Sequence, residues 1–376
     1  MAQLIYNPAY RTYDFGEEHP FSPLRLDMVL DLLKELGHDV SYDEAGPATR
    51  EELLTVHAPE YVSAVEAASA GDVTPALPFG LGAPDTPAFP GVDMAARYLV
   101  GGTLAAARTI TGGRASKVLH FGGGLHHSRR AKAAGFCVYN DLAIALKHLT
   151  SNGLYAAYLD IDVHHGDGVQ DIFNEDDKVL TISLHESGQY LWPGTGDIRE
   201  LGAGMGRGLK VNIPLEPFTE DDSYLQVFEK VVPEALRSFT PGVLVVQAGA
   251  DAHFDDPLAD LMLTTRAYEA LFRRILELSD EYAQGRLLVT LGGGYSVKAT
   301  PRIWTMLYLI MNGLPLPDEL PPAWLARWEE RMKDTLPPRL HDPQGSFEPI
   351  PRREEISRQN KQVADRLLES TVRYWI

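Results

Sequence analysis

The chain has 376 residues, of which 44% are apolar, and a formal net charge of −18 at neutral pH. This length and composition allow one large α/β domain or two ordinary ones. The acidic charge argues against direct binding of nucleic acid and mildly favours cationic substrates, although it suits plain solubility equally well. The single cysteine, Cys137, excludes a disulfide framework.

The amino terminus, MAQLIYNPAY, lacks the charged start and apolar segment of a secretory leader. The longest apolar runs, such as 303–311, are well short of the roughly 20 residues that span a bilayer. We therefore expect a soluble cytoplasmic protein with no membrane partner.

Strand and helix patterns alternate along the chain. Short apolar runs predict a first strand at 4–7 and further strands at 117–121, 155–161, 178–184, 209–213, 242–247 and 286–291. Helical patterns predict helices at about 25–36, 49–57, 59–69, 93–110, 141–149, 220–239, 265–282 and 354–374. The Gly- and Pro-rich segment 72–92 is predicted to be a long loop.

Apolar strands separated by helices indicate an α/β fold with a central, mostly parallel sheet and helices on both faces. We expect one domain over residues 1–376, in which the Pro-rich segment 315–376 is an extension whose terminal helix packs on the body. In open α/β sheets, ligands bind at the carboxyl ends of the strands. Reactive side chains follow four predicted strands, and we expect them to meet at one edge: 126–127, 160–167, Asp251 and Tyr295.

The stretch YLDIDVHHGDG, at 158–168, is the centre of this predicted site. It begins as a buried strand, in which alternate side chains share a face. We therefore expect Asp160, Asp162 and His164 on one face while the chain stays extended. So many ionisable groups beside an apolar strand indicate pairing or metal binding rather than a solvated loop.

Asp162, His164 and Asp251 together supply two carboxylates and one imidazole. Three protein ligands with an open fourth position are typical of a catalytic metal site. Zinc is the metal that we expect, and Fe(II) also accepts oxygen and nitrogen ligands.

His126 and His127 follow three glycines. Adjacent side chains diverge in a helix or strand, so we expect this pair to serve acid/base chemistry rather than to bind one ion jointly. Asp160 and Asp167 are the remaining acids of the central stretch, and each can orient an imidazole and raise its pKa. Tyr295 follows a second run of three glycines, and its phenol can donate to a carbonyl or an oxyanion.

Three more residues are expected near this edge. Cys137 is predicted to be a small buried residue that lines the site, not a nucleophile. Phe136 and Trp192 either form a slot for a thin aliphatic chain or belong to ordinary core packing. Together these residues predict metal-assisted hydrolysis of a carbonyl compound: activated water attacks, a His–Asp pair takes its proton, Tyr295 stabilises the oxyanion, and a histidine protonates the leaving group.

The sequence resembles the zinc-dependent histone deacetylase family, including its bacterial acetoin-utilization and acetylpolyamine members. The matching pieces occur in the family's order from residue 19 to about 296: HPFSPLR, GGGLHHSRRAKAAGFCVYND, YLDIDVHHGDGVQDIF, TISLH, PGTGD, GADAHFDDPL and LGGGYS. The resemblance implies a single arginase-like domain that hydrolyses the acetyl amide of ε-acetyl-lysine in proteins, or of a related acetylated amine.

The resemblance also implies roles for single residues. The implied zinc ligands are Asp162, His164 and Asp251. The implied catalytic set is His127 with Asp167 as general base, His126 with Asp160 as electrostatic partner or acid, and Tyr295 on the acetyl carbonyl. The implied substrate contacts are Gly135, Phe136 and Trp192 in the acyl-lysine tunnel, Leu258 at its rim, and Asp85 on the substrate backbone. Arg25 resembles the family's internal-channel arginine.

The family further implies a structural monovalent cation, usually potassium. It would be held by Asp160, Asp162, His164, Ser183 and Leu184. A second such site would use Phe173, Asp176 and Val179, with Leu209 at the remaining position.

Two departures leave the physiological substrate open. Trp192 stands where a Phe is commoner, and His253 in GADAH is seen in bacterial-type members. The alternatives to a lysine deacetylase are an acetylpolyamine amidohydrolase, a two-metal ureohydrolase of the same fold, and an inactive acyl-amine binding module.

Overall fold

Seven parallel strands form the centre of the protein in this computed structural model, which describes residues 2–38 and 40–375. Their order is β1-β2-β7-β6-β3-β4-β5, and all six neighbouring pairs are parallel. The strands are β1 (Gln3–Ile5), β2 (Lys117–His120), β3 (Ala156–Asp160), β4 (Val179–Glu186), β5 (Lys210–Leu215), β6 (Val243–Gln247) and β7 (Leu287–Thr290). The predicted α/β class and parallel sheet are confirmed, whereas the predicted domain limits at 1 and 376 lie outside the described residues.

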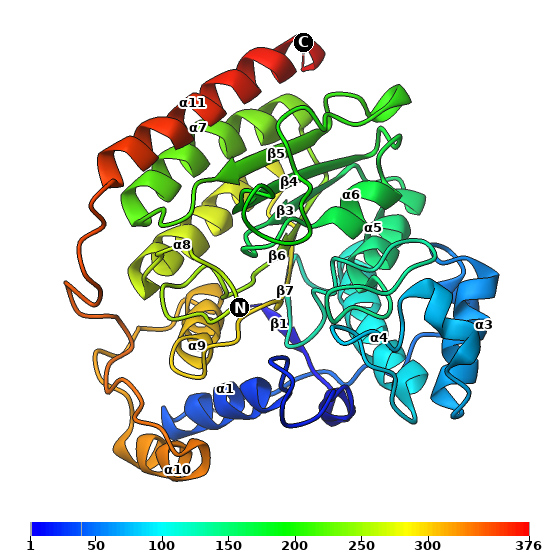
Figure 1. Cartoon of the computed structure of the whole chain (residues 1–376), viewed down its shortest axis with the longest axis horizontal. Helices are drawn as coiled ribbons and strands as arrows, with labels where there is room; N and C mark the ends of the chain where they lie inside the picture. The colour runs from blue at the N-terminus through cyan, green and yellow to red at the C-terminus, as the bar shows by residue number, and fades with distance from the viewer. Residues whose placement is uncertain (1, 39, 376) are drawn as a thin grey trace.

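Helices cover both faces of the sheet (Figure 1). One face carries α4 (Val92–Thr111), α5 (Asp141–Ser151) and α6 (Asp167–Ile172). The other carries α7 (Asp221–Phe239), α8 (Thr265–Tyr282), α9 (Thr300–Met311) and α1 (Leu24–Glu35). The remaining helices are α2 (Arg50–Leu53), α3 (Pro59–Ser69), α10 (Pro322–Met332) and α11 (Arg353–Thr371).

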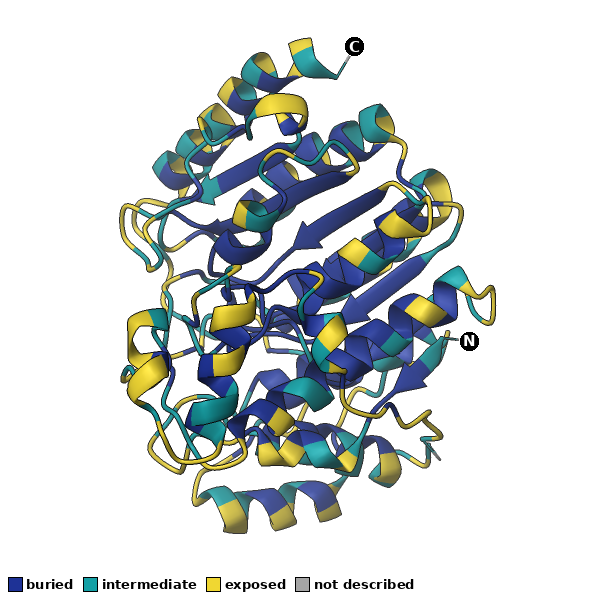
Figure 2. Cartoon of the chain, turned by 90° about the vertical axis from the view of Figure 1, so that its right-hand side faces the viewer, coloured by how far each residue is buried: buried dark blue, intermediate teal, exposed yellow. Residues whose placement is uncertain are grey.

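Burial on both faces explains why the strands are apolar without interruption. All five residues of β3 are buried, and Figure 2 shows the strands as a buried layer beneath helices whose outer sides are exposed. The helices are correspondingly amphipathic: in α8, Leu271, Ile275 and Leu278 are buried one helical turn apart.

Every predicted strand and helix is present, with ends that differ by a few residues. Three helices that the sequence did not predict are α6, α9 and α10. The helix α9 was missed because all but one of its residues are buried, so it has no polar face to give a helical period. The predicted loop 72–92 contains a 3₁₀ turn at Thr74–Phe79.

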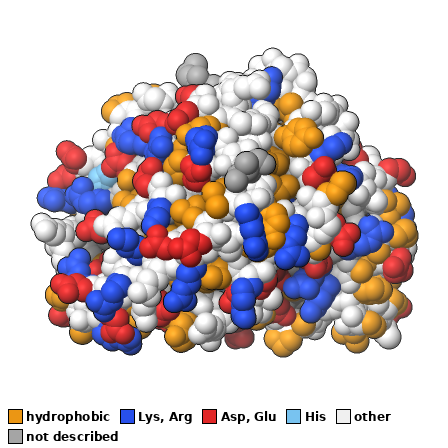
Figure 3. Space-filling model, turned by 90° about the horizontal axis from the view of Figure 1, so that it is seen from above, with side chains coloured by type: hydrophobic (Ala, Val, Ile, Leu, Met, Phe, Trp, Pro, Cys, Tyr) orange, Lys and Arg blue, Asp and Glu red, His pale blue; other side chains and the backbone are white. Residues whose placement is uncertain are grey.

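The C-terminal segment contacts the rest of the protein through α11 and α10. The helix α11 contacts α7 and β5, and Lys230 forms an ion pair with Asp365. In α10, Trp324 Nε1 donates to Met28 O at 3.0 Å. Figure 3 shows the side on which α11 lies, where basic and acidic side chains are interspersed. None of the helices within 2–38 and 40–375 is long and apolar enough to cross a membrane.

Candidate active site

Four chain segments meet at the carboxyl edge of the sheet because their strands are neighbours. The strands β2, β7, β6 and β3 lie side by side in that order. The loop after β2 carries His126 and His127, and the loops after β7 and β6 carry Tyr295 and Asp251. One hollow is lined by Asp162, His126, His127 and Tyr295, together with Gly135, Phe136 and Cys137.

Asp162, His164 and Asp251 form a compact group of metal-type ligands. His164 Nδ1 lies 3.2 Å from Asp162 Oδ1 and 3.2 Å from Asp251 Oδ2, and all three side chains are buried. The sequence expectation of an extended chain through His164 was wrong, because β3 ends at Asp160. Bends after the strand, rather than strand alternation, bring Asp162 and His164 together.

Backbone and amide donors hold the two carboxylates in place. Asp162 Oδ2 accepts from Gln247 Nε2 at 2.7 Å and from Gly293 N at 2.8 Å. Asp251 Oδ1 accepts from Val163 N at 2.9 Å. A Cβ atom at Gly293 would lie 1.9 Å from Asp251 Oδ2, so only glycine fits at this position.

The donor set fits a divalent metal. Burial and the Asp162 carboxylate raise the pKa of Asp251 to about 8. Burial opposes protonation of His164, yet Asp162 and Asp251 outweigh it and raise its pKa to about 10. Two buried carboxylates around one imidazole therefore favour a positive charge between them, and their O, N and O donors match a catalytic metal site.

Two His–Asp pairs lie beside this group. His126 Nδ1 is 2.7 Å from Asp160 Oδ2, and His127 Nδ1 is 2.8 Å from Asp167 Oδ1. The two Nε2 atoms are 2.9 Å apart. The expectation that adjacent histidine side chains diverge was wrong here, because His126 and His127 lie in a loop and both rings turn toward the hollow.

The two imidazoles have opposite pKa shifts. Burial lowers the pKa of His126, but Asp160 and Asp162 outweigh it and raise that pKa to about 9. Burial and the charge on His126 lower the pKa of His127 to about 3, against the effect of Asp167. These opposite shifts favour the proton of the shared hydrogen bond on His126 Nε2 rather than on His127 Nε2.

Aromatic rings surround the entrance to the hollow. The Trp192 ring lies 4.5 Å from the His127 ring, and Phe136 lies 5.6 Å from the Tyr295 ring, between centroids. A Cβ atom at Gly135 would lie 2.5 Å from both His127 and Trp192, so a side chain there would fill the space between them. Cys137 is buried, as predicted, and lines the same hollow.

Two of the three remaining predicted residues, Asp85 and Arg25, contact loops that line the hollow. Asp85 is exposed, and its Oδ2 accepts from Gly135 N at 2.9 Å. Leu258 is partly buried in the loop after β6. Arg25 is buried and donates to Gly292 O and Gly294 O at 3.1 and 2.7 Å, which holds the loop that carries Tyr295.

The residues assigned to monovalent cations separate into two places. Asp160 pairs with Ser183 across β3 and β4, near the metal-type ligands. Phe173, Asp176 and Val179 instead precede β4 or begin it, at the amino end of the sheet. There, Val179 O already accepts a hydrogen bond from Lys210 Nζ at 2.7 Å.

Sequence reasoning missed several residues that orient the site. Tyr158 OH donates to Asp160 Oδ2 at 2.6 Å, and strand alternation places it on the same side as Asp160. Arg129 Nη2 donates to Asp167 Oδ2 at 2.9 Å. Asp256 accepts from Tyr295 N at 2.7 Å, and Gln247 holds Asp162. Gln247 and Tyr158 had a detectable signal, since each is a polar side chain in an apolar strand.

The fold and the donor set define a class of metal-dependent hydrolase. A family model described as "Histone deacetylase domain" matches residues 19–311, which is most of the chain. The chain therefore belongs to the histone deacetylase family and is a deacetylase-type hydrolase, as the sequence predicted.

Relatives and solved structures agree with this assignment. The chain is 43% identical over 373 residues to the acetoin utilization protein AcuC of Bacillus subtilis, covering 97% of this chain and 96% of that protein. It is 38% identical to AcuC of Staphylococcus xylosus, covering 97% and 96%. The crystal structure of an HDAC homologue from Aquifex aeolicus matches with a TM-score of 0.84 and 27% identity, covering 96% of this chain and 99% of that one. An HDAC homologue complexed with SAHA matches equally well.

Proposed function

We propose that this enzyme hydrolyses the acetyl amide of ε-acetyl-lysine in polypeptides. One observation carries the proposal: the buried Asp162–His164–Asp251 group and the hydrogen-bonded His126–His127 pair lie beside each other, with His126 Nε2 3.8 Å from Asp162 Oδ1. A metal-dependent amide hydrolase uses this combination of a metal position, a base and an acid.

Asp162, His164 and Asp251 would hold a divalent metal, with Zn²⁺ first and Fe²⁺ as the alternative. The chemistry that such a cation supplies when bound is Lewis acidity toward the acetyl carbonyl and a lower pKa for water. Gln247 and Gly293 keep the Asp162 carboxylate oriented toward the ion position.

The protein's own groups move the protons. Asp167 holds the Nδ1–H of neutral His127, so its Nε2 is the atom that takes a proton from the attacking water once that water replaces His126 as its hydrogen-bond donor. His126 keeps a proton at Nε2 because Asp160 holds its Nδ1, and it gives this proton to the leaving lysine amine. The Tyr295 phenol, whose pKa is raised well above its usual value by burial and by Asp251, stays protonated and donates to the oxyanion.

The remaining predicted residues position the substrate. Trp192, Gly135 and Phe136 form the acyl-lysine tunnel, which the approach of Trp192 to Gly135 supports. Leu258 borders the rim, and Asp85 binds the substrate backbone. A structural potassium ion beside Asp160, Asp162, His164, Ser183 and Leu184 completes the proposal. The predicted cytoplasmic location stays a prediction.

A substrate panel tests this function. We would measure kcat/KM of the zinc- and iron-loaded enzyme on acetyl-lysine peptides, acetylated polyamines and longer acyl-lysines, and we expect the acetyl-lysine peptides to be best. A higher kcat/KM on acetylpolyamines would favour the small-amine alternative. Tight binding without turnover would favour a binding module, and two metals per chain would favour a ureohydrolase-like site.

A further inference from the structure

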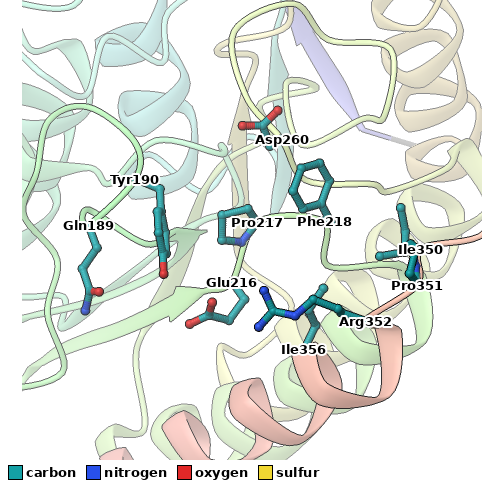
Figure 4. A pocket seen from close by; sticks show the side chains of 10 residues that line it. All are labelled: Gln189, Tyr190, Glu216, Pro217, Phe218, Asp260, Ile350, Pro351, Arg352 and Ile356. Atoms are coloured by element: carbon teal, nitrogen blue, oxygen red, sulfur yellow. The ribbon is translucent and has the colours of Figure 1, made fainter.

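An open groove of about 790 Å³ lies beside the proposed tunnel entrance. Four segments form it, as Figure 4 shows: the loop after β4, the loop after β5, the loop that contains Asp260, and the chain leading into α11. Its lining residues are Gln189, Tyr190, Glu216, Pro217, Phe218, Asp260, Ile350, Pro351, Arg352 and Ile356.

The groove shares its loops with the entrance. Tyr190 is two residues from Trp192, and Asp260 is two residues from Leu258. Two residues extend by at most about 7 Å, so both ends of the groove start close to the entrance. Glu186 also connects the groove with the metal-type ligands. Its N–H donates to Val163 O at 2.9 Å, and its carboxylate accepts from Asp260 N at 2.8 Å.

The groove combines exposed aromatic faces with free carboxylates. Tyr190 is 60% exposed and Phe218 is 46% exposed, so a large part of each ring is accessible to a ligand. Glu216 and Asp260 use their backbone atoms in hydrogen bonds, but neither carboxylate has a hydrogen-bond or ion-pair partner among residues 2–38 and 40–375. Arg352 is the one basic side chain of the lining, and it pairs with Glu355.

We propose that this groove binds the polypeptide segment next to the acetyl-lysine, and that Glu216 and Asp260 select a basic residue in that segment. The inference rests on the proposed function. A Lys or Arg side chain placed there meets two carboxylates that have no hydrogen-bond or ion-pair partner within the described residues, and the faces of Tyr190 and Phe218, which attract a cation. A small acetylated amine has no segment of this kind, so the groove favours protein substrates.

Matched peptides test the selection. We would compare acetyl-lysine peptides that carry either Arg or its neutral isostere citrulline two to six residues from the acetyl-lysine. For the parent enzyme we expect kcat/KM to be about five-fold higher with Arg, through KM. The double variant Glu216→Gln/Asp260→Asn should lose this preference. The control Asp222→Asn/Glu354→Gln removes two exposed charges outside the groove and should keep it.

Two readouts separate this inference from the proposed function. A single-residue acetyl-lysine probe should be hydrolysed equally by the parent and both double variants. Equal kcat/KM for the Arg and citrulline peptides with the active parent would overturn the groove and leave the deacetylase function standing. Peptide affinity measured calorimetrically on the slow variant Tyr295→Phe gives a second test: equal Kd values for the two peptides would also overturn the groove.

A second, independent observation concerns Lys210 at the start of β5. Its side chain is fully buried, and its Nζ donates to Val179 O at 2.7 Å. Within the described residues, no carboxylate forms an ion pair with it, which is rare for a buried lysine. Val179 belongs to the set that the family resemblance assigns to a second monovalent cation, and Lys210 directly follows Leu209, the fourth member.

We infer that Lys210 Nζ takes the place of this second cation. The nitrogen bonds a carbonyl oxygen that the ion would need, and it fills the position in either protonation state. The predicted set Phe173, Asp176 and Val179 therefore does not fit a free potassium ion in this chain. The protein should bind at most one monovalent cation.

Rubidium, a potassium surrogate, gives a direct count. Equilibrium dialysis with elemental analysis should find no more than one Rb⁺ per parent chain and one more in Lys210→Ala. The melting temperature of Lys210→Ala should rise more with KCl than with choline chloride at equal ionic strength, whereas the exposed control Lys178→Ala should behave like the parent. Two Rb⁺ per parent chain would overturn the inference, and this count needs no variant to fold.

Discussion

The carboxyl edge of the sheet and the C-terminal segment 315–376 both contain buried ionisable groups, but these groups have different partners. At the edge, the carboxyl groups of Asp162 and Asp251 both lie beside the single imidazole of His164. In the C-terminal segment, Asp342 accepts from Arg302 Nη2 at 2.9 Å and lies 2.9 Å from His253 Nε2.

The difference shows where each region obtains its stability. The Asp342 carboxylate is paired within the chain, and Thr265 adds two donors at 2.8 Å. At the carboxyl edge two carboxyl groups share the single His164 imidazole, and the divalent metal that the family implies would add positive charge there. A change at the edge should therefore remove function and spare the fold, whereas a change at Asp342 should do the reverse.

Asp251→Ala should have the largest effect on activity. Loss of one carboxylate ligand should remove the metal and lower kcat/KM by about 10³-fold or more. The metal-free variant should unfold within about 1 kcal/mol of the metal-free parent, since the change also removes a like-charge contact. Elemental analysis and urea unfolding measure the two quantities. The exposed Asp171→Ala is the control, and stoichiometric metal in Asp251→Ala would show that the ligand set is wrong.

Tyr295→Phe should separate chemistry from metal binding. Removal of the phenol hydrogen-bond donor should lower kcat by about 10²–10³-fold while metal content stays at the parent value. Stopped assays on an acetyl-lysine peptide give kcat, with Tyr308→Phe, outside the hollow, as the control. Parent-like turnover in Tyr295→Phe would refute the proposed role of this residue.

Asp342→Ala should lower the stability of the protein and leave its metal binding and activity intact. Arg302 and His253 would be left buried without their partner, which costs about 3 kcal/mol of unfolding free energy. The folded fraction should keep its metal and a kcat within about two-fold of the parent. Asp318→Asn, an exposed change in the same segment, should alter neither quantity. Metal loss in Asp342→Ala would mean that this network also supports the edge.

The sequence predicted those parts of the structure that depend on patterns of neighbouring residues in the chain. Uninterrupted apolar runs predicted the parallel strands, and the reactive residues that follow them indicated the edge where Asp251 and Tyr295 lie. Strand alternation failed after Asp160, because the strand stops there and the bend depends on neighbouring loops. The same limit explains why His126 and His127 converge although adjacent side chains were expected to diverge.

Long-range partners had no local signal. Arg129 contacts Asp167 across 38 residues, and Asp342 contacts His253 across 89. Neither arginine nor aspartate in these positions belongs to a period or a motif that specifies its partner. The buried helix α9 was also not predicted, because a helix packed on all sides has no amphipathic pattern.

A smaller effect extends the comparison to single histidines. Asp160 and Asp162 stabilise the protonated form of His126. His57, in contrast, must stay neutral, because its Nε2 accepts from Asn140 N at 3.0 Å and its Nδ1 lies 3.1 Å from Arg129 O. Burial lowers the pKa of His57 to about 4. The unfolded chain takes up a proton near pH 6.5 and the folded chain only near pH 4, so the contribution of His57 is complete above pH 6.5 and is lost as pH falls.

His57→Gln should make stability less sensitive to acid. Between pH 7 and pH 5 the parent should lose about 2 kcal/mol of unfolding free energy through this residue, and the variant should lose that much less. Urea unfolding at both pH values is best done in an Asp251→Ala background, where metal affinity does not add its own pH dependence. His38→Gln, which replaces a partly buried histidine, is the matched control. An equal loss with and without His57 would mean that other buried imidazoles, such as His120, carry the acid sensitivity.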